Sequence, residues 1–389
     1  MPDPRLFIQS LLVAAVVSLL IIWGLAGGRS ASAVGVARWR WVLCLGWVAG
    51  LATGWVRLGY AIPWPPATGL DRLLILVLPL AMALVLCGSK AGRGPGADPA
   101  SGTVHLLRGW VASGLALSGL MSLAVPWVLL WGSVHLTGGG AAAPFPSGPG
   151  CLFLASGVLL GLGERSLRRL LSRPAGWMVP GSLIGALLTA GTCVLLAGYL
   201  KGGATAFPLA GALLGGLLAT RDRQRGEPVG VSGRQEARRV LVTLGTISLY
   251  GVLFVGAAFG RLPGERALLV GLAPLAGWIT EWSLLRRWPS RWLPWVRGAA
   301  IALPLGLALG SAKRDFDRTL GPLVGHRAAR EQRPNCLELW SNLFTRTGVS
   351  FVQMETFPLL AAPNVVVDPC GSTTRLREPS ELEAVPACR

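Results

Sequence analysis

The stretch RDRQRGEPVGVSGRQEARR, residues 221–239, separates two long apolar runs and is the densest run of charge in the chain. It holds six Arg and three acidic residues. In a chain that crosses a membrane, Lys and Arg gather in the loops on the cytoplasmic side. The stretch therefore predicts its own side of the bilayer, and every other loop can be compared with it.

The composition indicates a membrane protein. Hydrophobic residues make up 52% and charged residues 14% of the 389 positions, and the mean hydropathy is +0.55. A soluble chain carries about 25% charged residues. The net charge of +18 comes largely from basic residues between apolar runs. A nucleic-acid-binding protein would gather such charge on one soluble domain, so we expect no nucleic acid partner.

Apolar runs of about 20 residues can cross the hydrocarbon core as helices. Their number predicts an all-α fold, a polytopic transmembrane helix bundle of about ten spans over residues 1–311. The fifth, ninth and tenth runs are short. The runs are Leu6–Ala26, Trp39–Val56, Leu73–Gly88, Gly109–Gly132, Gly148–Gly163, Met178–Tyr199, Gly203–Thr220, Val240–Gly260, Ala267–Thr280 and Trp295–Ser311.

The first run has an alternative interpretation as a signal peptide cleaved near Ala31-Ser32-Ala33. The run is long for the apolar part of a signal peptide, and only Arg5 precedes it. We therefore expect a retained span.

The orientation follows from Lys and Arg in alternate loops. The loops at 27–40, 89–108, 164–177, 221–239 and 281–297 hold 20 of them, and the opposite set holds 6. The first set is therefore predicted to be cytoplasmic, with the N-terminus outside, in a plasma membrane. We expect anionic lipid headgroups at Arg221, Arg223, Arg225, Arg238, Arg239, Arg286, Arg287 and Arg291.

Residues 312–389 form a tail of different composition. With ten spans the tail is extracytoplasmic, and we expect it to be loosely ordered. Several basic residues follow the tenth run closely, including Lys313 and Arg314. If Trp295–Ser311 does not cross the membrane, nine spans remain and the tail is cytoplasmic.

Small residues recur four apart, as in Gly46, Gly50 and Gly54 and in Gly211 and Gly215. Such faces let helices approach closely, either within one bundle or between subunits. Prolines lie well inside several of the apolar runs, at Pro79, Pro126, Pro208, Pro274 and Pro304. A proline removes a helix donor and can break the helix. Transport proteins use broken helices of this kind to expose backbone groups.

No nucleotide-binding, hydrolase or metal-binding motif occurs in the sequence, so we expect no catalytic residue, metal or cofactor. Ionisable residues near spans are the default candidates for function. The candidates are Arg57, Asp71, His135 and Glu281. Arg57 and Asp71 flank one outer loop and are expected to pair across it.

The stretches Trp64–Leu74, Gly132–Leu136 and Lys313–Asp317 resemble segments of uncharacterised multi-spanning membrane proteins of planctomycete bacteria. The resemblance covers roughly residues 40–320 and implies a bacterial inner-membrane protein. It implies no activity for any residue.

Three classes of function remain. The first is a transport or permease-like protein for an uncharged or apolar solute, because the spans are many and broken by proline. The second is a structural or assembly subunit that packs on a membrane-protein partner, or on its own copies, through glycine faces. The third is a membrane-embedded enzyme that uses His135 or Glu281.

Overall fold

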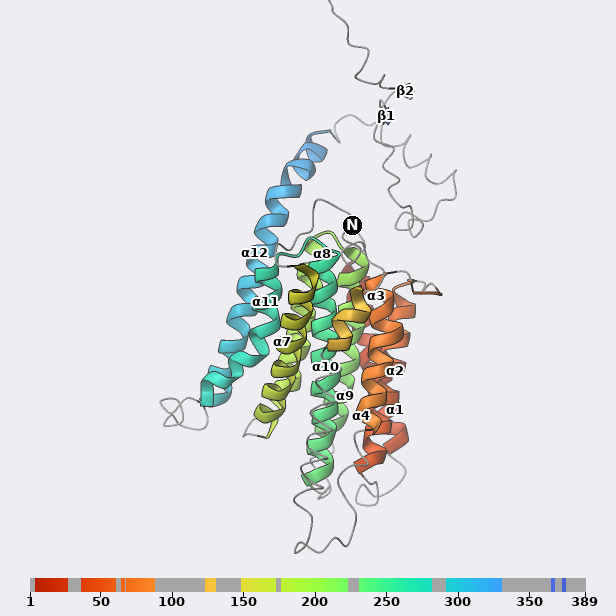
Figure 1. Ribbon diagram of the computed structural model, residues 1–389, viewed down its shortest axis with the longest axis vertical. Helices are drawn as coiled ribbons and strands as arrows, with labels where there is room; N and C mark the ends of the chain where they lie inside the picture. Colours follow the sequence, from red (N-terminus) through yellow and green to blue (C-terminus); the bar gives the residue numbers. More distant parts are fainter. Residues whose placement is uncertain are drawn as a thin grey trace, which may run out of the picture. The chain divides into compact units, whose positions relative to one another are not determined.

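The computed structural model is a bundle of helices (Figure 1). It describes residues 4–26, 36–60, 64–66, 68–87, 123–130, 148–172, 176–222, 231–281, 292–330, 365–367 and 373–375. Its α-helices are α1 (Pro4–Ala26), α2 (Val36–Arg57), α3 (Gly69–Arg72), α4 (Leu78–Cys87), α7 (Gly148–Leu171), α8 (Met178–Leu196), α9 (Leu200–Asp222), α10 (Val231–Ala258), α11 (Gly264–Leu272) and α12 (Leu293–Arg330).

Six helices of the described residues are long and apolar enough to cross a membrane. They are Pro4–Ala26, Gly69–Leu86, Met178–Leu196, Leu200–Thr220, Gln235–Ala258 and Leu293–Thr319. They correspond to the first, third, sixth, seventh, eighth and tenth predicted runs. The predicted all-helical membrane bundle is confirmed at this level, whereas the count of ten spans and the outside N-terminus stay predictions.

The other predicted runs have varied outcomes. The second and fifth lie in α2 and α7, helices of 22 and 24 residues that are not among those six. Only residues 123–130 of the fourth run are described, and they are helical. The ninth run divides between α11 and a 3₁₀ helix, η2 (Ala273–Glu281).

The span Gly69–Leu86 also departs from regular α-helix. A π-helical turn, η1 (Leu73–Val77), joins α3 to α4 and ends two residues before Pro79. The side chain of Thr68 accepts a hydrogen bond from the backbone N–H of Asp71, and the carboxylate of Asp71 accepts one from the backbone N–H of Thr68. This reciprocal cap satisfies donors at the start of the helix.

The closest helix packing at glycine positions is that of α1 against α2 and α9. A Cβ at Gly50 would lie 2.5 Å from the carbonyl oxygen of Ala14, and one at Gly215 would lie 2.3 Å from that of Ala15. Ser18 of α1 donates a hydrogen bond to the carbonyl oxygen of Ala212 (3.1 Å). These glycine faces therefore pack within one chain, as the first interpretation of their spacing predicted.

Helix α8 packs against α9, and α10 packs against α2, α8 and α9 (Figure 1). α8 and α9 form an antiparallel hairpin through a short turn at Ala197–Tyr199, where Gly198 has φ of 90°. Leu183 and Leu213 lie against Gly245 of α10. We call α1, α2, α8, α9 and α10 the scaffold.

The helices extend into the arginine-rich stretch that sequence analysis treated as a connector. α9 continues to Asp222 and α10 begins at Val231, so only residues 223–230 lie between the two helices. Likewise α12 continues past residue 311, where the tail was expected to begin, to Arg330. Ala, Leu, Arg and Glu have high helix propensity, which explains both extensions.

The chain divides into two compact units, Met1–Val324 and Gly325–Arg389. In the second unit, β1 (Val365–Val367) pairs antiparallel with β2 (Thr373–Arg375). Apart from these two strands, the tail beyond Arg330 lies outside the described residues.

Candidate functional site

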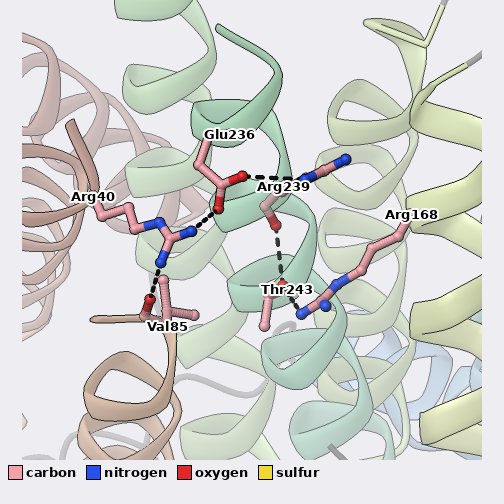
Figure 2. Close-up of polar contacts among 6 residues, drawn as sticks. All are labelled: Arg40, Val85, Arg168, Glu236, Arg239 and Thr243. Atoms are coloured by element: carbon pink, nitrogen blue, oxygen red, sulfur yellow. Dashed lines mark hydrogen bonds and ion pairs between the residues drawn. The ribbon is translucent and has the colours of Figure 1, made fainter. Parts of the chain in front are cut away.

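Buried polar groups lie at both ends of the bundle and in its interior. The largest group, which we call the arginine cluster, consists of Arg40, Glu164, Arg168, Glu236, Arg239 and Thr243. Figure 2 shows these residues except Glu164, together with Val85. The residues of the cluster come from α2, α7 and α10.

Arg40 connects three helices. Its Nη2 lies 2.5 Å from Oε1 of Glu236 in α10, and its Nη1 donates to the carbonyl oxygen of Val85 in α4 (3.2 Å). The side chains of Arg40 and Glu236 are 13% and 15% exposed. The carbonyl of Val85 lies in the last turn of α4, where the helix has no donor of its own. Arg40 thus satisfies a free carbonyl and a nearly buried carboxylate together.

Arg168 connects α7 with α10. Its Nη2 donates to Oε1 of Glu164 (2.6 Å) and to Oγ1 of Thr243 (2.9 Å). Thr243 in turn donates to the backbone oxygen of Arg239 in its own helix (3.0 Å). Arg239 lies 3.3 Å from the second carboxylate oxygen of Glu236 (Figure 2).

Another pair links α3 with α9. Asp71 is fully buried, and its Oδ1 lies 3.3 Å from Nζ of Lys201. Its Oδ2 accepts hydrogen bonds from the backbone N–H and the hydroxyl of Thr68. The expected pair of Arg57 with Asp71 is wrong, because Arg57 instead donates to Oε1 of Gln9 in α1 (2.9 Å). Lys201 reaches Asp71 because α9 lies beside α3, which sequence distance could not reveal.

Glu281, another candidate, lies at the end of η2 beside Arg297. Nη2 of Arg297 is 3.4 Å from Oε1 of Glu281, and the same nitrogen and Nε donate to Oγ1 of Thr280 at 2.7 and 3.0 Å. Arg297 is buried, although its segment was expected to lie on the lipid surface. These contacts of Arg297 connect α12 with η2, and Glu281 takes part in them as the ion-pair partner.

The remaining predicted residues are only partly described. His135, Arg223, Arg225, Arg286, Arg287 and Arg291 lie outside the described residues. Arg221 lies in the last turn of α9, and Arg238 and Arg239 lie in the third turn of α10. Sequence analysis missed Arg40, Lys201, Arg168 and Glu236, whose partners are distant in the sequence.

Several buried polar side-chain atoms inside the scaffold have no hydrogen-bond partner among the described residues, including the indole nitrogen of Trp47 and the hydroxyl of Ser248. Ser248 of α10 is fully buried, and its hydroxyl makes no hydrogen bond to any part of the described chain. Its neighbours in sequence contrast with it, because Thr243 and Thr246 donate to carbonyls of their own helix. Three residues further along α10, Gly251 lies against Leu73 of the π-helical turn. A buried hydroxyl without a partner requires a physical reason, such as a ligand.

The polar contacts join helix ends whose loops the Lys and Arg count assigns to the same side of the membrane. Arg40 and Glu236 belong to the predicted cytoplasmic loops. Asp71 and Lys201 belong to the opposite set, as do Arg57 and the first helical turns of α1. Arg266, from the same opposite set, forms an ion pair with Asp315 of α12.

No family model matches the chain, and no curated protein and no solved structure is detectably similar to it. The resemblance to planctomycete membrane proteins therefore stays a prediction. The six apolar helices indicate a membrane protein, and any more specific function has to be argued from the residues themselves.

Proposed function

We propose that this chain is a multi-pass permease-like protein that moves an uncharged or apolar solute across the membrane. The observation that carries the proposal is that two spans leave the α-helical conformation beside a closely packed scaffold. The segment Gly69–Cys87 contains a π-helical turn, and the segment Gly264–Glu281 changes from α-helix to 3₁₀ helix. Broken helices beside a rigid unit are typical of transport proteins.

The scaffold supplies the rigid part. Its glycine contacts leave no room for a side chain between α1 and either neighbour, so these helices cannot slide without separating. A passage for a solute is therefore expected between the scaffold and the two broken spans.

The segment Gly69–Cys87 is held at both ends. Lys201 pairs with Asp71 at its start, and Arg40 binds the carbonyl of Val85 near its end. Between these two contacts lies the π-helical turn, a feature frequently found at functional sites. We infer that the segment moves against the scaffold when one of the two end contacts opens.

Ser248 supplies a polar group for the passage. Its hydroxyl is buried, makes no hydrogen bond within the described residues and lies one turn from the contact of Gly251 with Leu73. A solute that enters there can accept or donate a hydrogen bond without displacing an existing one. Leu73, which contacts Gly251 one turn along α10, is apolar, which suits a solute without charge.

The contacts between helix ends also support the proposed division of the loops into two sides. They join loops of the same predicted side, and α12 runs from Arg297, beside Glu281, to Asp315, beside Arg266. This course favours a tenth span over a re-entrant segment. We propose a plasma-membrane protein with the N-terminus and the tail outside.

Cysteine accessibility tests the transport proposal. A Ser248→Cys variant, with the native cysteines replaced, would be exposed to a small membrane-impermeant thiol reagent in vesicles of each orientation. We expect labelling from at least one side, because the passage admits water when it opens. Ser18→Cys is the matched control, because Ser18 is equally buried but lies inside the α1 packing. Protection of both positions from both sides would contradict the proposal.

A second candidate is an assembly subunit, favoured by one face of α12. No described residue has an atom within 4 Å of a Cβ built at Gly306 or Gly310, and Leu303 and Leu307 on the same helix are exposed. Such a face can accept a partner helix in the membrane. Purification of a stoichiometric complex in mild detergent, lost on Gly306→Leu, would favour this function over transport.

A further inference from the structure

The last two turns of α7 carry three exposed arginines, Arg165, Arg168 and Arg169. Arg168 is fixed against α10 by its hydrogen bond to Thr243, although its side chain remains 45% exposed. Arg239 of α10 is 49% exposed and belongs to the same arginine cluster (Figure 2). The ends of two neighbouring helices therefore present four guanidinium groups to the surroundings.

The acidic residues of the cluster are already engaged. Glu236 is shared by Arg40 and Arg239, and Glu164 pairs with Arg168. Within the described part of the chain, Arg165 and Arg169 have no acidic partner. The cluster consequently has an excess of positive charge, which attracts an anion with several acceptor oxygens.

The same helix becomes apolar immediately before these arginines. Val158, Leu159 and Leu162 are exposed, at 53%, 48% and 55%. Leu162, Arg165 and Arg169 are spaced by three and four residues, so they share one face of α7. This face therefore changes from apolar to basic within about two turns, which matches a molecule with an apolar chain and an anionic head.

We propose that the C-terminal end of α7, together with Arg239, is a binding site for the phosphate headgroup of an anionic phospholipid. Arg165, Arg169 and the exposed side of Arg239 contact the phosphate oxygens, and the acyl chain lies along Val158, Leu159 and Leu162. Arg168 positions the site by holding α7 against α10. The site is independent of the transport proposal, because it lies on the outer face of α7.

The exposed apolar stripe argues for a lipid rather than free phosphate. Free phosphate would use the arginines alone, whereas Leu162 and its neighbours gain burial only against an acyl chain. Arginine forks bind phosphate oxygens in pairs and are typical of such headgroup sites.

Native mass spectrometry of the purified full chain tests this site. The protein would be titrated with dioleoyl phosphatidylglycerol or with dioleoyl phosphatidylcholine, and one retained lipid would be counted. The test variant is Arg165→Gln with Arg169→Gln, which leaves the bonds of Arg168 intact. The matched control is Lys313→Gln with Arg314→Gln, which removes the same charge from exposed positions of α12.

We expect phosphatidylglycerol to be retained in preference to phosphatidylcholine. The α7 variant should lower its affinity roughly ten- to thirty-fold, since each surface arginine attracts an anionic lipid by about 1 kcal/mol. The control should bind as the wild type does, and millimolar inorganic phosphate should not displace the lipid.

Three outcomes would overturn the proposal. Equal retention of both lipids would show that the protein does not distinguish an anionic headgroup from a zwitterionic one. Equal weakening in the two variants would show a general charge effect rather than a site. Displacement of the lipid by inorganic phosphate would identify a phosphate site in its place.

Discussion

At the scale of single residues, burial decides how much an ion pair contributes to the stability of the bundle. Glu236 contacts two arginines, Arg40 with a side chain 13% exposed and Arg239 with one 49% exposed. An exposed ion pair contributes little because water screens it. Removal of one partner from a buried pair leaves an uncompensated charge and is strongly destabilising.

These two arginines give the first prediction. Arg40→Ala should lower the free energy of unfolding by about 3 kcal/mol, because Glu236 loses its buried partner and the carbonyl of Val85 loses its donor. Arg239→Ala should lower it by less than about 1 kcal/mol. Equilibrium unfolding in mixed detergent micelles measures both. Equal effects would show that Glu236 does not depend on Arg40.

Asp71 and Lys201 give the second prediction. Asp71→Ala should destabilise the protein strongly, since it leaves Lys201 without its partner and removes the cap on Thr68. The double variant Asp71→Asn with Lys201→Gln should recover part of this loss, because neither new side chain is charged. A double-mutant cycle compares the melting temperatures of Asp71→Asn, Lys201→Gln and the double variant, and gives the coupling between the two residues. Strict additivity of the two single changes would contradict the ion pair.

At the scale of helices, glycine positions decide which elements can approach. Gly215 and Gly50 hold α1 in place, whereas Gly306 on α12 has open surroundings. The amino-acid type is the same and the helical conformation is the same. Only the neighbours differ, so the effect of substitution should differ as well.

The third prediction compares two of these glycines. Gly215→Ala should destabilise the bundle by roughly 1–3 kcal/mol, because the new methyl group meets the carbonyl oxygen of Ala15 at 2.3 Å. Gly306→Ala should be neutral or slightly stabilising, since alanine is the better helix former. Thermal melting of both variants in one detergent provides the comparison. A harmless Gly215→Ala would contradict the close packing of α1.

Much of this level was predictable from the sequence. The apolar runs predicted where the helices lie, and the spacing of glycines every four residues in α2 and α9 predicted the packed faces. The breaks were harder to locate. Pro208 and Pro304 lie inside continuous α-helices, while Pro274 lies in the 3₁₀ segment and Pro79 lies two residues after the π-helical turn. Whether a proline breaks a membrane helix depends on neighbours that satisfy the freed carbonyl groups.

The polar sites were less predictable, because they depend on contacts between distant segments. Arg40 and Glu236 are separated by 196 positions, and Asp71 and Lys201 by 130. Asp71 and Glu281 were recognised as candidates from their places at span ends. Their partners were not, because local sequence contains no information about which helix lies alongside.

At the scale of the whole molecule, the account depends on helices that alternate in direction and on two polar ends that face opposite sides of the bilayer. The charge count assigns the sides, and the ion pairs between helix ends agree with it. Arg266 with Asp315 joins the loop after α10 to the end of the last span.

The number of spans gives the fourth prediction. A variant that keeps Cys388 as its single cysteine should react with a membrane-impermeant maleimide in intact spheroplasts, because ten spans place the tail outside. Reaction only after permeabilisation would mean an odd number of spans and a cytoplasmic tail.

The most direct test of the account is the sidedness of its two ends. Single cysteines at Gly226, within the arginine-rich stretch, and at Pro263, which is exposed between α10 and α11, would be labelled with an impermeant maleimide in spheroplasts. The account predicts that Pro263→Cys reacts in intact spheroplasts and that Gly226→Cys reacts only after permeabilisation. Reaction of both positions from the same side, or the reverse order, would contradict it.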